Sequence, residues 1–188
     1  MSSKQKILIG IVIVVLVVIV FAGKVIGWRN QLVVLDEQVK KSWSNIDNQL
    51  QRRMDLIPNL VETVKGYASH EKEVLTQITE ARAKVAGAAS TKDKVDANNE
   101  LSSVLSRLLV VVENYPDLKA NQNFLSLQDE LSGTENRIAV ERRRYNEAVG
   151  QFNTTRRKFP YMIFAGQFPE AVYFEASPKA AEAPKVSF

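Results

Sequence analysis

Charged residues interrupt the apolar stripes of the expected helices, and these are the side chains that could carry chemistry. Arg53 falls in a line of apolar residues that includes Leu60, and Glu71 falls in a line that includes Val64. A charge on a core stripe is costly unless it is paired. Similar interruptions occur further along the chain, at Glu113, Glu135 and Glu141-Arg142.

Three interpretations of these charges are open. The first is an inter-helix network that fixes helix register, for instance Arg53 or Arg142 with Glu113 or Glu135. The second is a catalytic or ligand-binding carboxylate cluster inside a helical bundle. The third is a stripe that faces solvent at these points. A water-filled cavity lined by Arg53, Glu71 and Glu113 would favour the second, and neutralised pairs without a cavity would favour a structural role.

The sequence lacks the residues that common catalytic sites require. His70 is the single histidine, position 74 is Val, and the chain contains no cysteine. A zinc-protease helix needs a second His four residues on, and a carboxylate di-metal bundle needs paired Glu-x-x-His motifs. There is also no phosphate-binding glycine loop and no nucleophile elbow. We therefore expect no metal, no cofactor and no enzymatic activity.

Basic clusters are present but do not indicate nucleic-acid binding. Three consecutive helical residues spread around much of the helix, and acidic neighbours flank the middle cluster. No motif that reads nucleic acid accompanies them. We expect solvated faces and no nucleic-acid partner. The clusters are Arg52-Arg53, Arg142-Arg143-Arg144 and Arg156-Arg157-Lys158.

Apolar residues with a step of seven predict long helices. Two such lines run from Leu32 to Ala88, and their three-four spacing places them on one helix face, as in a coiled coil. Because the stripe keeps its phase across Pro58, we expect a kinked but continuous first helix. The first turn is expected at Gly87–Thr91, with Ser90 or Thr91 capping the next helix.

Two further helices are expected after this turn. The second ends at Asn114-Tyr115-Pro116, because proline disfavours helical geometry in the preceding residue. The third runs from about Lys119 to Arg157, marked by a step of seven from Phe124 to Phe159. Each helix has one apolar face that must be buried on the others. The sequence thus predicts an all-α fold: an antiparallel bundle of long helices after an N-terminal transmembrane helix.

The N-terminal stretch predicts a membrane anchor. Ile7 to Ala22 contains sixteen consecutive residues without a polar side chain. Extended to Trp28, it spans about 30 Å as a helix, the thickness of the hydrocarbon core of a bilayer. The expected partner is therefore the lipid bilayer, through Ile7–Trp28. A cleaved signal peptide is the alternative, but its apolar core is usually only ~7–15 residues long.

Basic residues flank this stretch on both sides and bear on its orientation. Two lysines precede it, and four basic residues follow within about 20 residues, which favours a cytoplasmic body. They are Lys4 and Lys6, then Lys24, Arg29, Lys40 and Lys41.

Three regions are expected: an anchor at 1–28, a helical bundle at 29–159 and an aromatic-rich, partly flexible tail at 160–188. Seven of the fifteen aromatic residues lie from Phe159 onward. Since disordered segments are poor in aromatics, we expect the tail to pack as far as Phe174 as a short helix or extended piece. A partner-binding or membrane-surface element is the alternative. Ser177 to Lys185 is expected to be flexible.

The chain resembles the LemA family over nearly its whole length. The resemblance is carried by Asn30 to Val39 with Trp43, by Gln51 to Tyr67 with His70-Glu71, by Glu113 to Ala120, and by Gly133 to Ile138 with Tyr145-Asn146. It implies a single-pass bacterial membrane protein with a helical-bundle body and supplies no catalytic residues. The stretch from Arg52 to Tyr67, including Asp55, Pro58 and Asn59, is then either a face for a partner or a kinked core helix.

The leading hypothesis is a membrane-anchored scaffold or adaptor that acts through protein–protein contacts, with self-association as one form of them. One alternative is a bundle enzyme or ligand sensor that uses the buried Arg and Glu positions. Another is an envelope protein that binds lipid surfaces through the tail and basic clusters.

Overall fold

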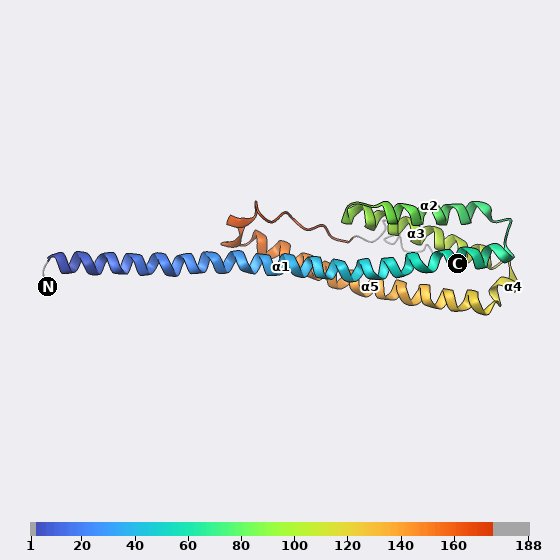
Figure 1. The fold of residues 1–188 in the computed structure, drawn as a ribbon, viewed down its shortest axis with the longest axis horizontal. Coiled ribbons are helices and arrows are strands. Elements are labelled where there is room, and N and C mark those ends of the chain that lie inside the picture. The colour runs from blue at the N-terminus through green and yellow to red at the C-terminus, as the bar shows by residue number, and fades with distance from the viewer. Residues whose placement is uncertain (1–2, 175–188) are drawn as a thin grey trace, which may run out of the picture. The chain divides into compact units, whose positions relative to one another are not determined.

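The computed structural model describes residues 3–174, and within them every regular element is helical. This confirms the expected all-α fold with a helical bundle. The elements, shown in Figure 1, are α1 (Ser3–Tyr67), α2 (Lys72–Gly87), α3 (Thr91–Val112), α4 (Pro116–Lys119), α5 (Gln122–Arg157) and the 3₁₀ helix η1 (Tyr161–Phe164).

The chain divides into two compact units, which are described separately. The described residues of the first, here called the anchor unit, are 3–41 and 147–171. Those of the second, the bundle unit, are 42–146 and 172–174. Helices α1 and α5 each contribute residues to both units.

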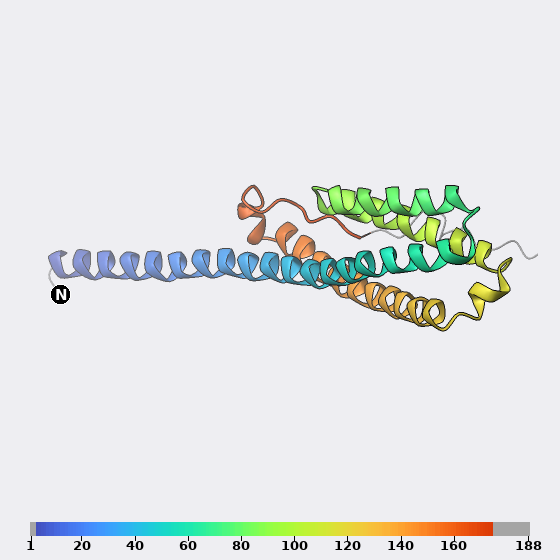
Figure 2. The ribbon, with the colours of Figure 1, turned by 45° about the vertical axis from the view of Figure 1, so that its right-hand side comes forward.

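The bundle unit buries the apolar faces of α1, α2, α3 and α5 in a common core. Figures 1 and 2 both show α2 and α3 side by side, with α4 in the connection that leads from α3 to α5. Most residues of the predicted stripes are almost completely buried, so these lines form the core; Tyr67, which the pattern also placed there, is 46% exposed. They include Ile57, Leu60, Val64, Ile78, Val85, Leu101, Leu108 and Phe124.

Helix α1 passes through Pro58 and ends at Tyr67, which confirms the continuous helix expected there. The expected position of the first turn was wrong. The chain turns at residues 68–71, where the Glu71 amide donates to the Ala68 carbonyl at 3.1 Å, and α2 begins at Lys72. Ala68 is fully buried and α2 buries its own apolar face in the same core, so the stripe continues across the turn.

The connection between α2 and α3 is a second turn, and its cap follows the prediction for Ser90. The Ser90 hydroxyl accepts a hydrogen bond from the Asp93 amide at 3.1 Å, and the Asp93 carboxylate accepts one from the Ser90 amide at 3.3 Å. This capping box satisfies two backbone N–H groups at the start of α3. At the other end, α3 stops at Val112 and Pro116 begins α4.

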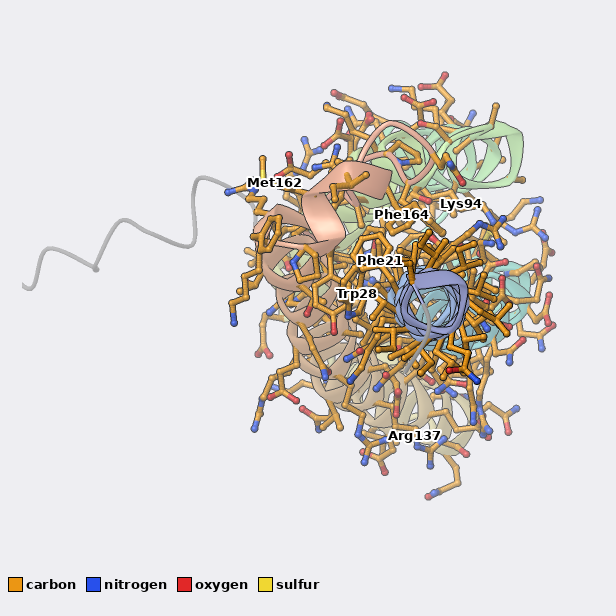
Figure 3. All side chains as sticks on the ribbon, turned by 90° about the vertical axis from the view of Figure 1, so that its left-hand side faces the viewer. Phe21, Trp28, Lys94, Arg137, Met162 and Phe164 are labelled. Atoms are coloured by element: carbon orange, nitrogen blue, oxygen red, sulfur yellow. The ribbon has the colours of Figure 1, made fainter. Side chains whose placement is uncertain are left out.

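In the anchor unit, none of the described residues covers the predicted membrane-spanning stretch. An 18-residue window in α1 has a mean hydropathy of 3.1, and none of it is buried. Figure 3, which looks along α1, shows side chains extending outward around its N-terminal part. Phe21 and Trp28 make an edge-to-face contact with ring centroids 6.2 Å apart.

Hydrogen bonds hold parts of the tail against α5 as far as Phe174, while Met162 and Ile163 remain exposed. In the anchor unit, Asn153 donates to the Ala171 carbonyl at 2.8 Å and accepts from its amide at 3.0 Å. In the bundle unit, Asn146 pairs with the backbone of Phe174 in the same way, and the Phe174 ring is 2% exposed beside Trp43. Ser177 to Lys185 lies outside the described residues.

Replacing the cap tests this assignment of the second turn. We expect Ser90→Ala to lower the free energy of unfolding by ~1 kcal/mol, because the Asp93 amide loses its partner. The matched control is Ser103→Ala, an exposed serine in the same helix. Urea unfolding followed by circular dichroism measures both. Equal midpoints for the two variants would contradict the capping role.

Candidate functional site

Arg53 is the charged side chain that the bundle unit buries, with 5% of its surface exposed. Its Nη1 donates to Asn98 Oδ1 at 3.0 Å and to Ser102 Oγ at 2.9 Å. The same nitrogen lies 3.0 Å from Glu135 Oε2. The guanidinium therefore connects α1 with α3 and α5. This is one of the inter-helix pairs that the sequence suggested, Arg53 with Glu135.

Burial and a neighbouring charge shift the pKa of Arg53 in opposite directions. Desolvation lowers the pKa of its guanidinium, and the nearby Glu135 carboxylate raises it. The Glu135 side chain is 50% exposed. The site is thus a buried cation whose counter-ion keeps contact with water, so the carboxylate escapes most of the desolvation cost of a buried pair.

A pocket of about 380 Å³ opens beside this pair. Within the described residues, Nε and Nη2 of Arg53 have no hydrogen-bond partner. The fully buried unpaired side-chain atoms belong to Gln49 and Gln77 instead, so the free N–H groups of Arg53 reach accessible space. The pocket combines hydroxyl and amide groups with leucines. Its lining comprises Arg53, Leu60, Ser102, Leu105, Ser106, Leu108, Leu109, Gln128, Leu131, Ser132, Glu135 and Asn136.

Glu71 and Glu113 do not line this pocket. Glu71 lies in the turn before α2, where its carboxylate accepts a hydrogen bond from the Tyr115 hydroxyl at 2.8 Å. That hydrogen bond raises the pKa of Tyr115. Glu113 is exposed and forms an ion pair with Lys119. A cavity lined by Arg53, Glu71 and Glu113, which would favour a ligand-binding cluster, is therefore not what the described residues form; the pocket holds Arg53 and Glu135 instead.

Arg142 makes a different contact from those suggested by the sequence. Its guanidinium lies over the Phe174 ring, 5.8 Å from the centroid. A cation–π contact of this kind holds the end of the described tail on α5.

Four further residues singled out in the sequence lie on the exposed side of α1: Arg52, Asp55, Pro58 and Asn59. Arg52 approaches Glu130 at 3.6 Å, with both side chains about half exposed. Asp55 accepts a hydrogen bond from Gln51 at 2.9 Å, one turn away. The side chain of Asn59 has no partner in the part of the chain that the structure describes. Arg52, Asp55 and Asn59 can therefore be replaced without disturbing the core.

A model of the LemA family matches residues 42–188, which is most of the chain. The chain belongs to the LemA family. The match begins at Ser42, where the bundle unit also begins. The resemblance inferred from the sequence is thus confirmed.

Bacterial relatives include magnetosome proteins and a LemA protein. Magnetosome protein MamQ 2 of Paramagnetospirillum magneticum is 26% identical over 89% of this chain and 72% of its own length. Protein LemA of Metamycoplasma hominis is 28% identical over 74% of this chain and 64% of its own length. Magnetosome protein MamQ of Magnetospirillum gryphiswaldense is 22% identical over 87% of this chain and 71% of its own length. With the apolar part of α1, these matches describe a membrane-associated protein of the LemA type.

Two members of the Arg53 site were missed in the sequence of this LemA protein. Asn98 is 3% exposed, and Ser102 lies four residues further along α3. Asn98 follows Val95 by three residues and precedes Leu101 by three, which is the spacing of the apolar stripe. A polar residue in that position was the available signal for a buried hydrogen bond.

Replacing two glutamates of α5, one at a time, distinguishes the ion pair of the buried Arg53 from the exposed ion pair of Arg52. We expect Glu135→Ala to lower the free energy of unfolding by about 1–3 kcal/mol, because the buried guanidinium loses its counter-ion. In Glu130→Ala the exposed pair with Arg52 is lost, and we expect a change within ~1 kcal/mol. The two side chains are 50% and 49% exposed, so helix propensity and burial are matched. Urea unfolding measures the loss in free energy of unfolding for both variants. Equal losses would contradict the role of Glu135 as the counter-ion of the buried Arg53.

Proposed function

We propose that this LemA-family protein is a membrane-tethered helical scaffold that works through protein–protein contacts and not through catalysis. In this proposal the tether is a single span, Ile7–Trp28, and the basic residues that follow it favour a body on the cytoplasmic side. The observation that carries the proposal is that α1 is one helix from Ser3 to Tyr67. The element that carries the apolar stretch therefore also supplies an exposed face in the bundle unit.

That face is the part of α1 that we assign to a protein partner. Arg52, Asp55 and Asn59 are spaced by three and four residues, so they lie on one side of the helix. Arg53 and Ile57, which point into the core, lie on the other side. An exposed polar row with few internal contacts fits a recognition surface, since its groups remain free to bind another protein. Self-association through the same row is one form of the proposal.

Site-specific photocrosslinking in native membranes tests the face. A photoreactive phenylalanine derivative at Asn59 should give one discrete crosslinked product, because this side chain is exposed and has no internal partner. The matched control is the same label at Glu80, an exposed residue of α2 in the same unit. We expect no such product there.

A second substitution makes this experiment specific. Asp55→Lys reverses a charge one turn from Asn59 and should remove the product, while the circular dichroism spectrum stays unchanged. Co-purification of two differently tagged copies shows whether the product is a dimer of this chain. The same products from Asn59 and Glu80, or persistence in Asp55→Lys, would contradict the proposal.

The pocket beside Arg53 supports a second candidate function, ligand sensing. Its volume lies in the range of small-molecule sites, ~300–1,000 Å³. Because Glu135 balances the charge of Arg53, the pocket suits a neutral or zwitterionic molecule more than an anion. Such a ligand would accept hydrogen bonds from the free N–H groups of Arg53 and place an apolar part against the leucines.

Filling the pocket tests this candidate. Native mass spectrometry of the full chain should show a co-purified small molecule that is absent from Ser106→Trp, whose indole would occupy the pocket. The matched control is Ser103→Trp, which lies on the same helix but does not line the pocket. A wild-type protein without a bound molecule, or equal binding in both variants, would contradict ligand sensing.

A further inference from the structure

A short apolar segment of the anchor unit stays exposed next to the end of the predicted span. Phe159 is 79% exposed, Met162 56% and Ile163 67%. The last two belong to η1, and Met162 is labelled in Figure 3. Three large apolar side chains within five residues are an unusual group to leave in water, and grouped exposure of this kind marks an interaction surface.

This segment is held against α1 at a defined position. The Tyr161 hydroxyl donates to Gln31 Oε1 at 2.5 Å, and Arg29 Nε donates to Gln167 Oε1 at 3.4 Å. Arg156 fixes the return of the chain, since its Nε donates to the Phe168 carbonyl at 2.5 Å. Met162 and Ile163 therefore lie between two residues that contact α1: Tyr161, which binds Gln31, and Gln167, which binds Arg29. Both partners in α1 come shortly after Trp28.

Helix geometry places these contacts at the membrane surface. A hydrocarbon core of about 30 Å corresponds to about 20 residues at a rise of 1.5 Å, so a span that starts at Ile7 ends near Ile26. Gln31 then lies about 7.5 Å beyond that end. The headgroup layer on each side is about 5–7 Å thick. Tyr161 is thus held at the outer edge of the headgroup layer, and Arg29, which contacts Gln167 about 4.5 Å beyond the same end, lies within it.

We propose that Phe159, Met162 and Ile163 insert into the boundary between headgroups and acyl chains of the leaflet that α1 leaves at Trp28. This inference rests on the proposed membrane tether. The occupant is lipid because the surface continues from the span itself, within the same compact unit. Lys158 is exposed beside these residues, where its ammonium can meet lipid phosphates. The protein therefore has a second membrane contact besides the span, held next to it by the hydrogen bond between Tyr161 and Gln31, which are 130 residues apart in the chain.

The absence of cysteine from the sequence makes each introduced label unique. Full-length Ile163→Cys carries an environment-sensitive fluorophore and is placed in phosphatidylcholine–phosphatidylglycerol nanodiscs. We expect blue-shifted emission that brominated acyl chains quench and aqueous iodide does not. Val17→Cys, in the middle of the span, is the lipid control. Val110→Cys, 70% exposed on α3, is the aqueous control.

Each result decides a separate question. If iodide quenches the Ile163 label and brominated lipid does not, as for the Val110 label, the inference is overturned. The proposed membrane tether is not affected by that result. A label shielded from both quenchers also overturns it, because protein then covers the segment. If the Val17 label is not quenched by brominated lipid, the tether itself fails and the inference fails with it.

A double substitution tests whether the group acts together. Phe159→Ser with Met162→Ser should reduce the lipid quenching of the Ile163 label severalfold and leave the Val17 label unchanged. Unchanged quenching at Ile163 would overturn the proposed insertion of the group. Val110→Ser, which removes an exposed apolar side chain of α3, is the matched control and should change neither signal.

Discussion

The constraint on which the rest of the structure depends is the apolar surface at the start of α1, which no part of the described chain covers. Fourteen large apolar side chains between Ile7 and Phe21 are each about half exposed. Leaving half of such a side chain in water costs on the order of 1 kcal/mol. Their sum is comparable with the ~5–15 kcal/mol that stabilises a whole domain. The LemA-type body thus cannot compensate for this exposure by its own folding. In the proposed tether lipid supplies the burial, and this sets the level at which the residues after Trp28 meet the membrane surface.

The bundle unit faces a different constraint, because it places a cation in a largely apolar interior. Three contacts of Arg53 Nη1 satisfy one part of the guanidinium, and Glu135 supplies the counter-charge from a half-exposed position. A leucine at position 53 would avoid the desolvation cost altogether. The arrangement is therefore a poor way to gain stability, and it is explained better by register or by binding. The free N–H groups facing the pocket favour binding, whereas the links to α3 and α5 favour register.

The sequence was sufficient for the all-helical fold and insufficient for the first turn, so α1 and α2 were predicted as one helix. A step of seven identifies the buried face of each helix, since it depends only on which side chains need burial. The turn at 68–71 shifts one line by a single residue, because Ala68 and Leu75 are buried where the step of seven predicts Tyr67 and Val74, while Ile78 resumes the other line. No proline marks the break. The Arg53–Glu135 pair was foreseeable from two charges on apolar stripes. The contribution of Ser102 was not, because a half-buried serine in a helix has no distinctive spacing.

The two proposed roles of the bundle unit use opposite sides of one helix turn, and this makes them separable. Arg53 and Ile57 face the core, whereas Asp55 and Asn59 are exposed. Positions two residues apart on a helix differ by about 200° around its axis. A change at Asp55 therefore alters the outer face without touching the Arg53 contacts, and a change at Ser106 alters the pocket without touching that face. One route that couples these two sides runs through α1 itself, because Arg53 stands between Arg52 and Asp55 in the same turn. A ligand that draws the guanidinium away from Asn98 would act first on this turn, and a partner bound to the outer face would sense that movement.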